Sequence, residues 1–268
     1  MATATQPGTG PISGTVLFYS KPEPLSVDLH KTMGVKRLDG PFNFAKEGHA
    51  VPLTVTEFGV AALSSPIIFV GDEKIPLAVM GLNAGENMYL TDAGYFEPGV
   101  YVPAYIRRYP FVYANDSAAG QMVLCIDRAA EFIVDGAAAD LPFFDAAGQP
   151  TEYTQNCINF CNDYETERQR TQSFVQLLTE LDLFETKTAN FVPTNPDGTP
   201  GETQKIAEYF GVSETKLNAL PIEKYAELRD NGALGQIYAH LHSLIGWDRL
   251  VALAMTKQAE AEQRPLNS

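Results

Sequence analysis

The chain has 268 residues and a formal net charge of −14, with 45% hydrophobic and 19% charged residues. Such a chain can bury a sizeable core, in one large domain or two tightly joined halves, and the low charged fraction argues against disorder. Because the acidic surface repels phosphate groups and no basic run offsets it, we expect no binding to nucleic acid or to an anionic membrane.

No apolar stretch approaches the roughly 20 residues that span a bilayer. The start of the chain is small and polar and lacks the basic and apolar regions of a secretory signal. The 3 cysteines are too few, and odd in number, for a disulfide framework. We therefore expect a soluble protein with no membrane insertion and a cytoplasmic location.

The first part of the chain is predicted to be rich in strands. Residues 1–14 are expected to form a flexible tail, and residues 15–150 a β-rich half. Short apolar and aromatic runs separated by Gly, Pro, Asn and Asp are typical of hairpins and a mostly antiparallel sheet. The predicted strands are 15–19, 67–70, 75–82, 88–90, 111–114 and 122–126.

Two short helices are expected within this β-rich half. Thr54 and Glu57 fit a capping box, in which each side chain binds an otherwise unpaired helix amide. Pro103 is suited to the first position of a second helical turn.

Residues 151–268 are predicted to form a helical half. Apolar residues recur with helical spacing over 151–184, and further helices are expected near 202–209, over 213–230 and from Ala233 past Met255. Together these patterns predict an α+β fold in which the helical half packs on the sheet in one compact unit.

The chain carries no recognisable catalytic or cofactor signature. It has no Gly-x-Ser-x-Gly elbow, no glycine-rich phosphate loop and no His-Glu-x-x-His motif. We therefore assign no catalytic residue and no cofactor, and an enzymatic activity is not the favoured interpretation.

The cysteines and histidines do not predict a metal site. Cys157 and Cys161 share a helix face but lack further ligands at a metal-binding spacing, so core packing is favoured. His240 and His242 are two residues apart, about 200° around a helix, and cannot share one metal. For His240, two interpretations stay open: a buried imidazole that holds a carbonyl or carboxylate, and contact with a ligand.

Adjacent arginines in an aromatic segment are the most distinctive candidates for binding. Arg107 and Arg108 lie beside Tyr105 in YVPAYIRRYPFVY. Arginine binds carboxylates in a bidentate fork and stacks on aromatic faces, so a clamp for an anionic or aromatic ligand is one interpretation. The alternative is an internal ion pair with one of the 33 acidic residues, such as Asp127.

These segments resemble the SapC family of bacterial proteins. Blocks that match the family in order include FNFA at 42–45, VPLTVTEFGVAAL at 51–63, SPIIFVGD at 65–72, YVPAYIRRYPF at 101–111, LCID at 124–127 and IYAHLHSL at 237–244. The resemblance implies an accessory role in nutrient uptake or in peptide or tryptophan modification, beside tryptophan-halogenase-like proteins. It supplies no established catalytic residues.

We expect an accessory or ligand-binding protein with a protein partner or a small anionic or aromatic ligand. The candidate binding residues are Tyr105, Arg107, Arg108 and His240. The alternatives are an enzyme of undefined type, such as a metal-dependent one, and a surface-layer-associated structural protein.

Overall fold

The computed structural model describes residues 17–116, 121–193, 199 and 201–263. All strand pairs among these residues are antiparallel, and helices occupy most of the C-terminal part, which confirms the predicted α+β class. The tail predicted for residues 1–14 lies outside the described residues.

The chain divides into two compact units, each built from two segments. The first unit contains Met1–Pro41 and Arg108–Glu165, and the second contains Phe42–Arg107 and Thr166–Ser268. The change of composition at residue 150 therefore falls inside the first unit. A domain boundary at that residue stays a prediction.

The first unit holds two small sheets. One has the order β1-β7-β6 and contains a long hairpin, in which Phe111 lies opposite Ile126; the other has the order β8-β2-β9. Its strands are β1 (Pro22–Pro24), β2 (Met33–Val35), β6 (Phe111–Asp116), β7 (Gln121–Asp127), β8 (Ile133–Asp135) and β9 (Leu141–Pro142). Its helical elements are α1 (Val27–His30), η3 (Gly136–Ala138) and the first half of α4 (Glu152–Glu180). The buried core includes Met33, Phe111, Ile126, Phe143 and Cys161.

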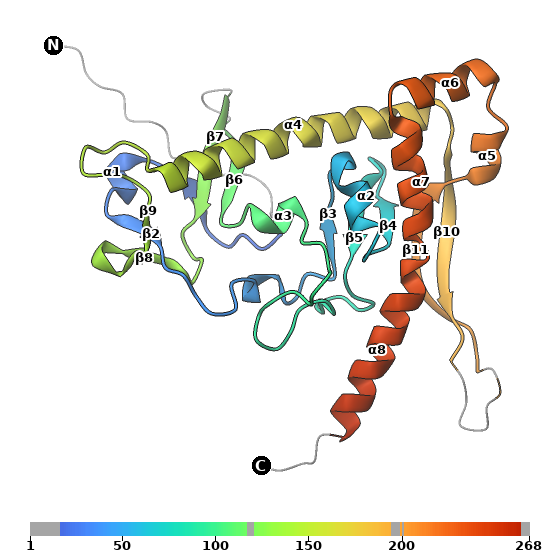
Figure 1. The fold of residues 1–268 in the computed structure, drawn as a ribbon, viewed down its shortest axis with the longest axis horizontal. Helices are drawn as coiled ribbons and strands as arrows, with labels where there is room; N and C mark the ends of the chain where they lie inside the picture. Colours follow the sequence, from blue (N-terminus) through green and yellow to red (C-terminus); the bar gives the residue numbers. More distant parts are fainter. Residues whose placement is uncertain (1–16, 117–120, 194–198, 200, 264–268) are drawn as a thin grey trace. The chain divides into compact units, whose positions relative to one another are not determined.

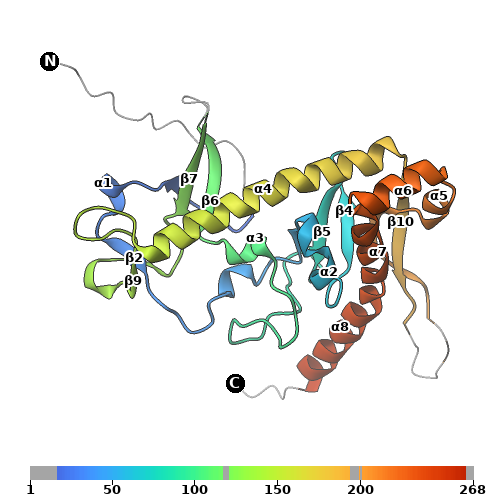
Figure 2. The ribbon, with the colours of Figure 1, turned by 45° about the horizontal axis from the view of Figure 1, so that its top comes forward.

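The second unit contains a five-stranded antiparallel sheet in the order β10-β11-β4-β5-β3. The strands are β3 (Ala50–Pro52), β4 (Ile67–Val70), β5 (Ile75–Val79), β10 (Phe184–Phe191) and β11 (Gln204–Val212). The helical elements, besides the second half of α4, are η1 (Asn43–Ala45), η2 (Val55–Glu57), α2 (Phe58–Ala61), α3 (Ala104–Arg107), α5 (Glu214–Asn218), α6 (Ile222–Asp230), α7 (Ala233–Ser243) and α8 (Gly246–Gln263). In Figures 1 and 2, α7 runs along the sheet beside β4 and β11.

Four aromatic rings from the helices and the sheet pack together in the second unit. Phe58 of α2 makes edge-on contacts with Phe69 of β4 and Phe174 of α4, with ring centroids 6.1 and 5.8 Å apart. Phe69 in turn lies 5.0 Å from the ring of Phe184 in β10. Such edge-on pairs add to the stabilisation from burial, and they tie the helices to the sheet.

The helix predicted near 202–209 is wrong, because this segment is the strand β11. Ile206, Tyr209 and Phe210 are three and four residues apart, a spacing that a helix also shows. The strand forms because it pairs with β10 along its length and with β4 at Phe210 opposite Phe69. Pairing on both sides satisfies its backbone groups and overrides the local pattern.

Two predicted strands are also corrected. Of the strand predicted over 15–19, residues 15 and 16 lie outside the described residues, and Leu17 and Phe18 form a turn, with Phe18 at a positive φ of 75°. Tyr19 is buried, and its hydroxyl donates to the Phe111 carbonyl at 2.6 Å. Residues 88–90 supply only a single bridge, from Leu90 to Phe96. The Asn87 side chain accepts a hydrogen bond from the Tyr89 amide, so the backbone forms a turn there instead of pairing as a strand.

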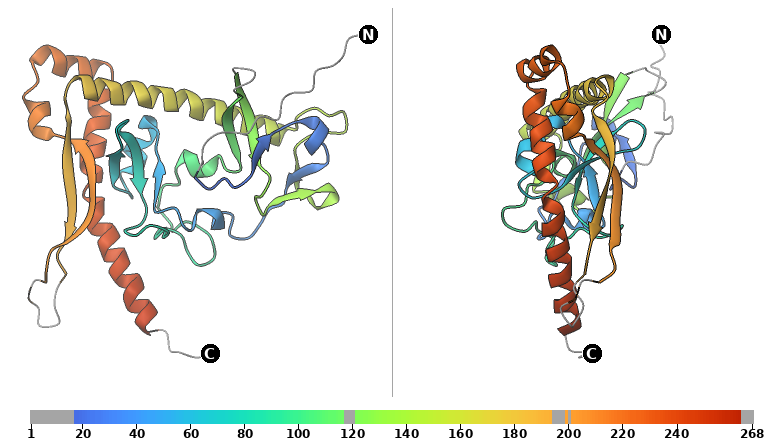
Figure 3. Two further views of the ribbon diagram at one scale, coloured as in Figure 1. Left: turned by 180° about the vertical axis from the view of Figure 1, so that it is seen from behind. Right: turned by 90° about the vertical axis from the view of Figure 1, so that its right-hand side faces the viewer.

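The helix predicted from Ala233 past Met255 is interrupted. It ends at Ser243, and α8 begins at Gly246 in a new direction (Figure 3). A Cβ atom on Gly246 would lie 3.1 Å from the ring of Pro66. The break therefore lies beside Pro66, just before β4, where a residue with a Cβ atom would be crowded, and the sequence pattern does not reveal this neighbour.

Candidate functional site

Arg107 presents a guanidinium that its neighbours hold at the surface of the second unit. Its Nε donates to the Val102 carbonyl and its Nη2 donates to the Tyr101 hydroxyl, each at 3.0 Å. The guanidinium carbon lies 5.8 Å from the centre of the Tyr101 ring. Two hydrogen bonds and a ring contact therefore orient an exposed cation.

A buried carboxylate fixes the tyrosine that holds Arg107. Glu57 is 6% exposed, and its Oε1 accepts from the Tyr101 hydroxyl at 2.9 Å and from the Ala104 amide at 2.6 Å. Its Oε2 accepts from the amide and the hydroxyl of Thr54, at 2.8 and 2.7 Å. The capping box predicted from sequence is confirmed. The sequence did not reveal that the same carboxylate also anchors Tyr101 and the start of α3.

The protonation of Tyr101 suits this chain of contacts. Burial raises the pKa of its hydroxyl, the neighbouring Glu57 carboxylate raises it further, and Arg107 opposes both. The phenol therefore stays protonated at neutral pH. Its hydroxyl donates a hydrogen bond to Glu57 and accepts a hydrogen bond from Arg107.

Arg108, the next residue, belongs to the first unit and rests on other rings. Its guanidinium carbon lies 4.4 Å from the centre of the Tyr164 ring and 5.9 Å from that of Tyr19. The two adjacent arginines thus have different aromatic partners. That both act together on one ligand stays a prediction.

Tyr105, a third predicted binding residue, is buried within α3. Only 6% of its surface is exposed. Contact with a ligand there also stays a prediction.

His240 lies fully buried between α7, β4 and β11. The Val212 amide donates to its Nε2 at 3.0 Å, so Nδ1 carries the proton and donates to the Ile67 carbonyl at 2.9 Å. The hydroxyl of Ser243, one helical turn further on, accepts a hydrogen bond from the Ile67 amide at 2.9 Å and donates one to the His240 carbonyl. Burial lowers the pKa of the imidazole to about 4, although the hydrogen bond to the Ile67 backbone opposes this shift. This geometry supports the interpretation of a buried imidazole that holds a carbonyl.

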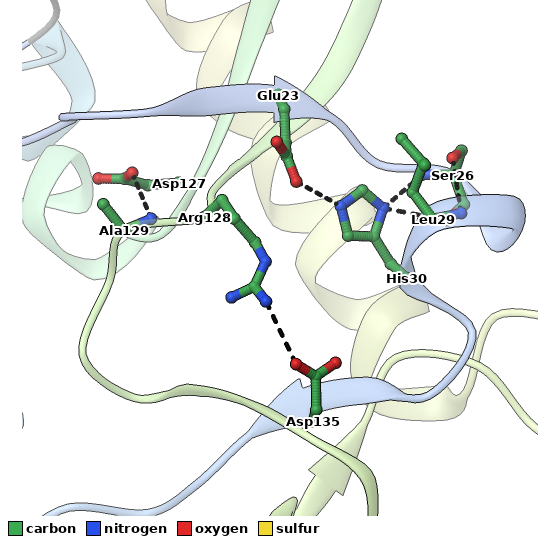
Figure 4. A network of polar contacts seen from close by, with 8 residues as sticks. All are labelled: Glu23, Ser26, Leu29, His30, Asp127, Arg128, Ala129 and Asp135. Carbon is green, nitrogen blue, oxygen red and sulfur yellow. Dashed lines mark hydrogen bonds and ion pairs between the residues drawn. The ribbon is translucent and has the colours of Figure 1, made fainter.

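The first unit contains a polar cluster that sequence reasoning did not single out (Figure 4). His30 is fully buried; its Nε2 lies 2.9 Å from a carboxylate oxygen of Glu23, and its Nδ1 contacts the backbone of Ser26. Arg128 pairs with Asp135 at 3.3 Å. The signal available in the sequence was a histidine four residues after a serine that caps α1.

Asp127, at the end of β7, is the most heavily hydrogen-bonded carboxylate of this cluster. It is 0% exposed and accepts from the amides of Ser20, Lys21 and Ala129 at 2.8–3.1 Å. It also accepts from the Tyr109 hydroxyl at 3.1 Å. Burial raises the pKa of Tyr109, and the nearby Asp127 charge raises it further, so its hydroxyl remains a hydrogen-bond donor. These contacts attach the segment before β1 to the sheet.

The cysteines lie in apolar surroundings. Cys125 and Cys161 are buried, Cys157 is partly buried, and Cys161 belongs to the core of the first unit. Burial raises the pKa of Cys125 to about 11 and that of Cys161 to about 12, with Arg108 opposing the shift at Cys161. These environments disfavour the thiolate, which is the reactive form of cysteine.

We expect Cys125 and Cys161 of the native protein to resist alkylation. At pH 8 their thiolate fractions are about 100-fold or more below that of an ordinary thiol, since each pKa unit is a tenfold change. Iodoacetamide labelling followed by peptide mass spectrometry should show Cys157 reacting first. The unfolded protein is the control, in which all three should react at similar rates. Rapid labelling of native Cys161 would contradict the burial seen here.

Two further properties concern only the residues that the structure describes. No group of three or more His, Cys, Asp or Glu side chains among them is arranged to hold a metal ion. None of their helices is both long and apolar enough to cross a membrane.

The fold defines an α+β protein with small antiparallel sheets and buried carboxylates that organise its loops. A family model described as SapC matches residues 25–250, and the chain therefore belongs to the SapC family. Searches of curated proteins and of solved structures gave no match.

Proposed function

We propose that this SapC-family chain is a soluble, cytoplasmic accessory protein that binds a ligand rather than catalysing a reaction. The supporting observation is Arg107, an exposed guanidinium oriented by Tyr101, which the buried Glu57 fixes in turn. An arginine that is already oriented loses little conformational entropy when it binds a planar anion.

The ligand class follows from the chemistry around Arg107. A guanidinium recognises a carboxylate or a phosphate through paired hydrogen bonds, and the partly exposed aromatic ring of Tyr101 lies next to it. A small anionic molecule with an aromatic part, or an acidic segment of a protein partner, would satisfy both features. The family resemblance adds the proposal that this ligand belongs to nutrient uptake or to peptide or tryptophan modification.

We expect Arg107→Gln to weaken binding of N-acetyltryptophan, an anionic aromatic probe, by about tenfold, the effect of losing one charged hydrogen-bonded contact. Titration calorimetry measures the affinity, and the urea midpoint verifies folding. Tyr101→Phe, which keeps the ring but removes the hydroxyl that orients Arg107, should give a smaller loss.

Arg249→Gln is the matched control. Arg249 is also an exposed arginine of the second unit, and it likewise donates to a backbone carbonyl, that of Leu63 at 3.3 Å. If both substitutions weakened probe binding equally, the change in the protein's overall charge would explain the effect, and a site at Arg107 would be contradicted. Absence of binding by the unaltered protein would contradict the proposed ligand class.

A further inference from the structure

A separate hollow lies within the second unit, where η2, the C-terminal half of α4 and the start of α7 meet. Its volume is about 210 Å³. Val55, Phe174 and Leu177 give it apolar lining, and Arg170, Ser173 and Gln236 are among its polar lining residues. Figures 1 and 2 both show the end of α4 beside the start of α7.

The size of the hollow restricts what it can hold. A water molecule takes up about 30 Å³ of liquid, so the space equals roughly seven waters. Drug-sized ligands occupy pockets of about 300–1,000 Å³. The hollow therefore suits a small metabolite of about ten non-hydrogen atoms.

Hydrogen bonds and packing form the hollow before any ligand arrives. The Val55 amide donates to the Thr171 hydroxyl at 2.8 Å, and that hydroxyl donates to the Glu167 carbonyl at 2.7 Å, so η2 is tied to α4. Phe174 is 8% exposed and packs edge-on against Phe58. Binding to such a preformed site requires little ordering of the protein.

The charge of the hollow differs from that of the whole protein. The chain has 33 acidic and 19 basic residues, yet no Asp or Glu is among the described residues that line the hollow, whereas Arg170 is. Glu167 Oε1 lies 4.0 Å from Arg170 Nη1, which is the outer limit of an ion pair. The Arg170 side chain is 64% exposed, so its guanidinium is accessible to an anion.

We propose that this hollow binds a small organic monocarboxylate with a short apolar body. The carboxylate pairs with Arg170, the apolar body lies against Val55 and Phe174, and Ser173 and Gln236 offer further hydrogen bonds. This site is distinct in its residues from Arg107, and its occupancy does not depend on the function proposed for that residue.

Fluorine NMR with 4-fluorobenzoate tests the proposal, and 4-fluorobenzamide serves as the neutral probe of equal shape. We expect the benzoate to bind with a dissociation constant of about 0.1–1 mM, as small ligands of this size do. The amide should bind about tenfold more weakly because it lacks the charge. Equal binding of the two probes, or no binding of the benzoate, would overturn the proposal.

Substitutions then locate the binding. Arg170→Gln should weaken the benzoate about tenfold, and Ser173→Phe, an exposed position of α4 that fills the hollow, should abolish binding. Arg168→Gln removes the same charge two residues away in α4 and should change affinity less than twofold. All of these variants are compared in an Arg107→Gln background, because Arg107 is itself proposed to bind anionic aromatic molecules. Benzoate that still binds in that background reports on the hollow alone, which separates this test from that of the proposed function. Unaltered affinity in both Arg170→Gln and Ser173→Phe would place the probe elsewhere and refute the site.

Discussion

Asp127→Ala is expected to destabilise the protein by about 3–5 kcal/mol, the range for breaking a buried charged network. The substitution removes the shared acceptor of three backbone amides and the Tyr109 hydroxyl, at a position with no solvent exposure. Water cannot readily replace the lost oxygens. Urea unfolding, followed by the near-ultraviolet signal of the tyrosines, measures the change.

Asp140→Ala is the matched control for Asp127. Asp140 is an exposed aspartate that accepts one hydrogen bond from a backbone amide, that of Arg37, at 2.9 Å. Its loss should cost at most about 1 kcal/mol, because water can reach the amide that it leaves. If both variants unfolded at the same urea concentration, the carboxylate of Asp127 would not have the organising role described here.

His240→Gln is expected both to destabilise the protein and to change how its stability depends on pH. Glutamine can reach one of the two backbone partners of the imidazole but not both, so a loss of about 2 kcal/mol is expected at pH 7.5. The second effect arises because burial holds the pKa of His240 at about 4 in the folded chain, against an ordinary value of 6.5.

The direction of the pH effect follows from proton binding. As pH falls from 6.5 towards 4, the unfolded chain binds a proton at His240 that the folded chain does not bind, so the stability of the folded state decreases. The full contribution, on the order of 3 kcal/mol, is present above pH 6.5 and is lost as pH falls through this window. In His240→Gln this contribution is absent. The difference of about 2 kcal/mol between variant and unaltered protein should therefore shrink as pH is lowered and, because the loss of about 3 kcal/mol is larger, change sign as pH approaches 4.

Urea unfolding at several pH values between 4 and 7.5 measures this difference. His242→Gln is the control, because His242 is exposed on the same helix two residues away. It should reproduce the pH dependence of the unaltered protein. A constant difference between His240→Gln and the unaltered protein across this range would show that the imidazole is not held neutral by the fold.

Features that depend on residues close in sequence were predicted well. The Thr54–Glu57 capping box and the strand at Ile67–Val70 match the structure, and α4 occupies most of 151–184. The periodicity that placed Cys161 on an apolar helix face also matches its burial. Capping, turn chemistry and amphipathic spacing act over a few residues, so they can be predicted from short stretches of the sequence.

Strand β11 shows where local pattern was insufficient. Its apolar residues fit a helix as well as a strand, and the choice was made by β10 on one side and β4, more than 130 residues away, on the other. The interruption of the last helix before Gly246 was missed for a similar reason, since Gly246 lies against Pro66, a residue far away in the sequence. A local stretch of sequence around β11 does not include β4, and one around Gly246 does not include Pro66.

The sequence by itself determined the α+β class, the acidic surface, the membership of the SapC family and several helices and strands, because these depend on composition and on short-range spacing. Only the tertiary structure decided which groups distant in the sequence the polar residues contact. Asp127 meets amides 106 and 107 residues away, and His240 meets a carbonyl 173 residues away. Arg107 and Arg108, although adjacent, turn to different rings. Such contacts form when the chain closes long loops around its cores, and the resulting burial fixes the hydrogen-bond partners and pKa values of these groups.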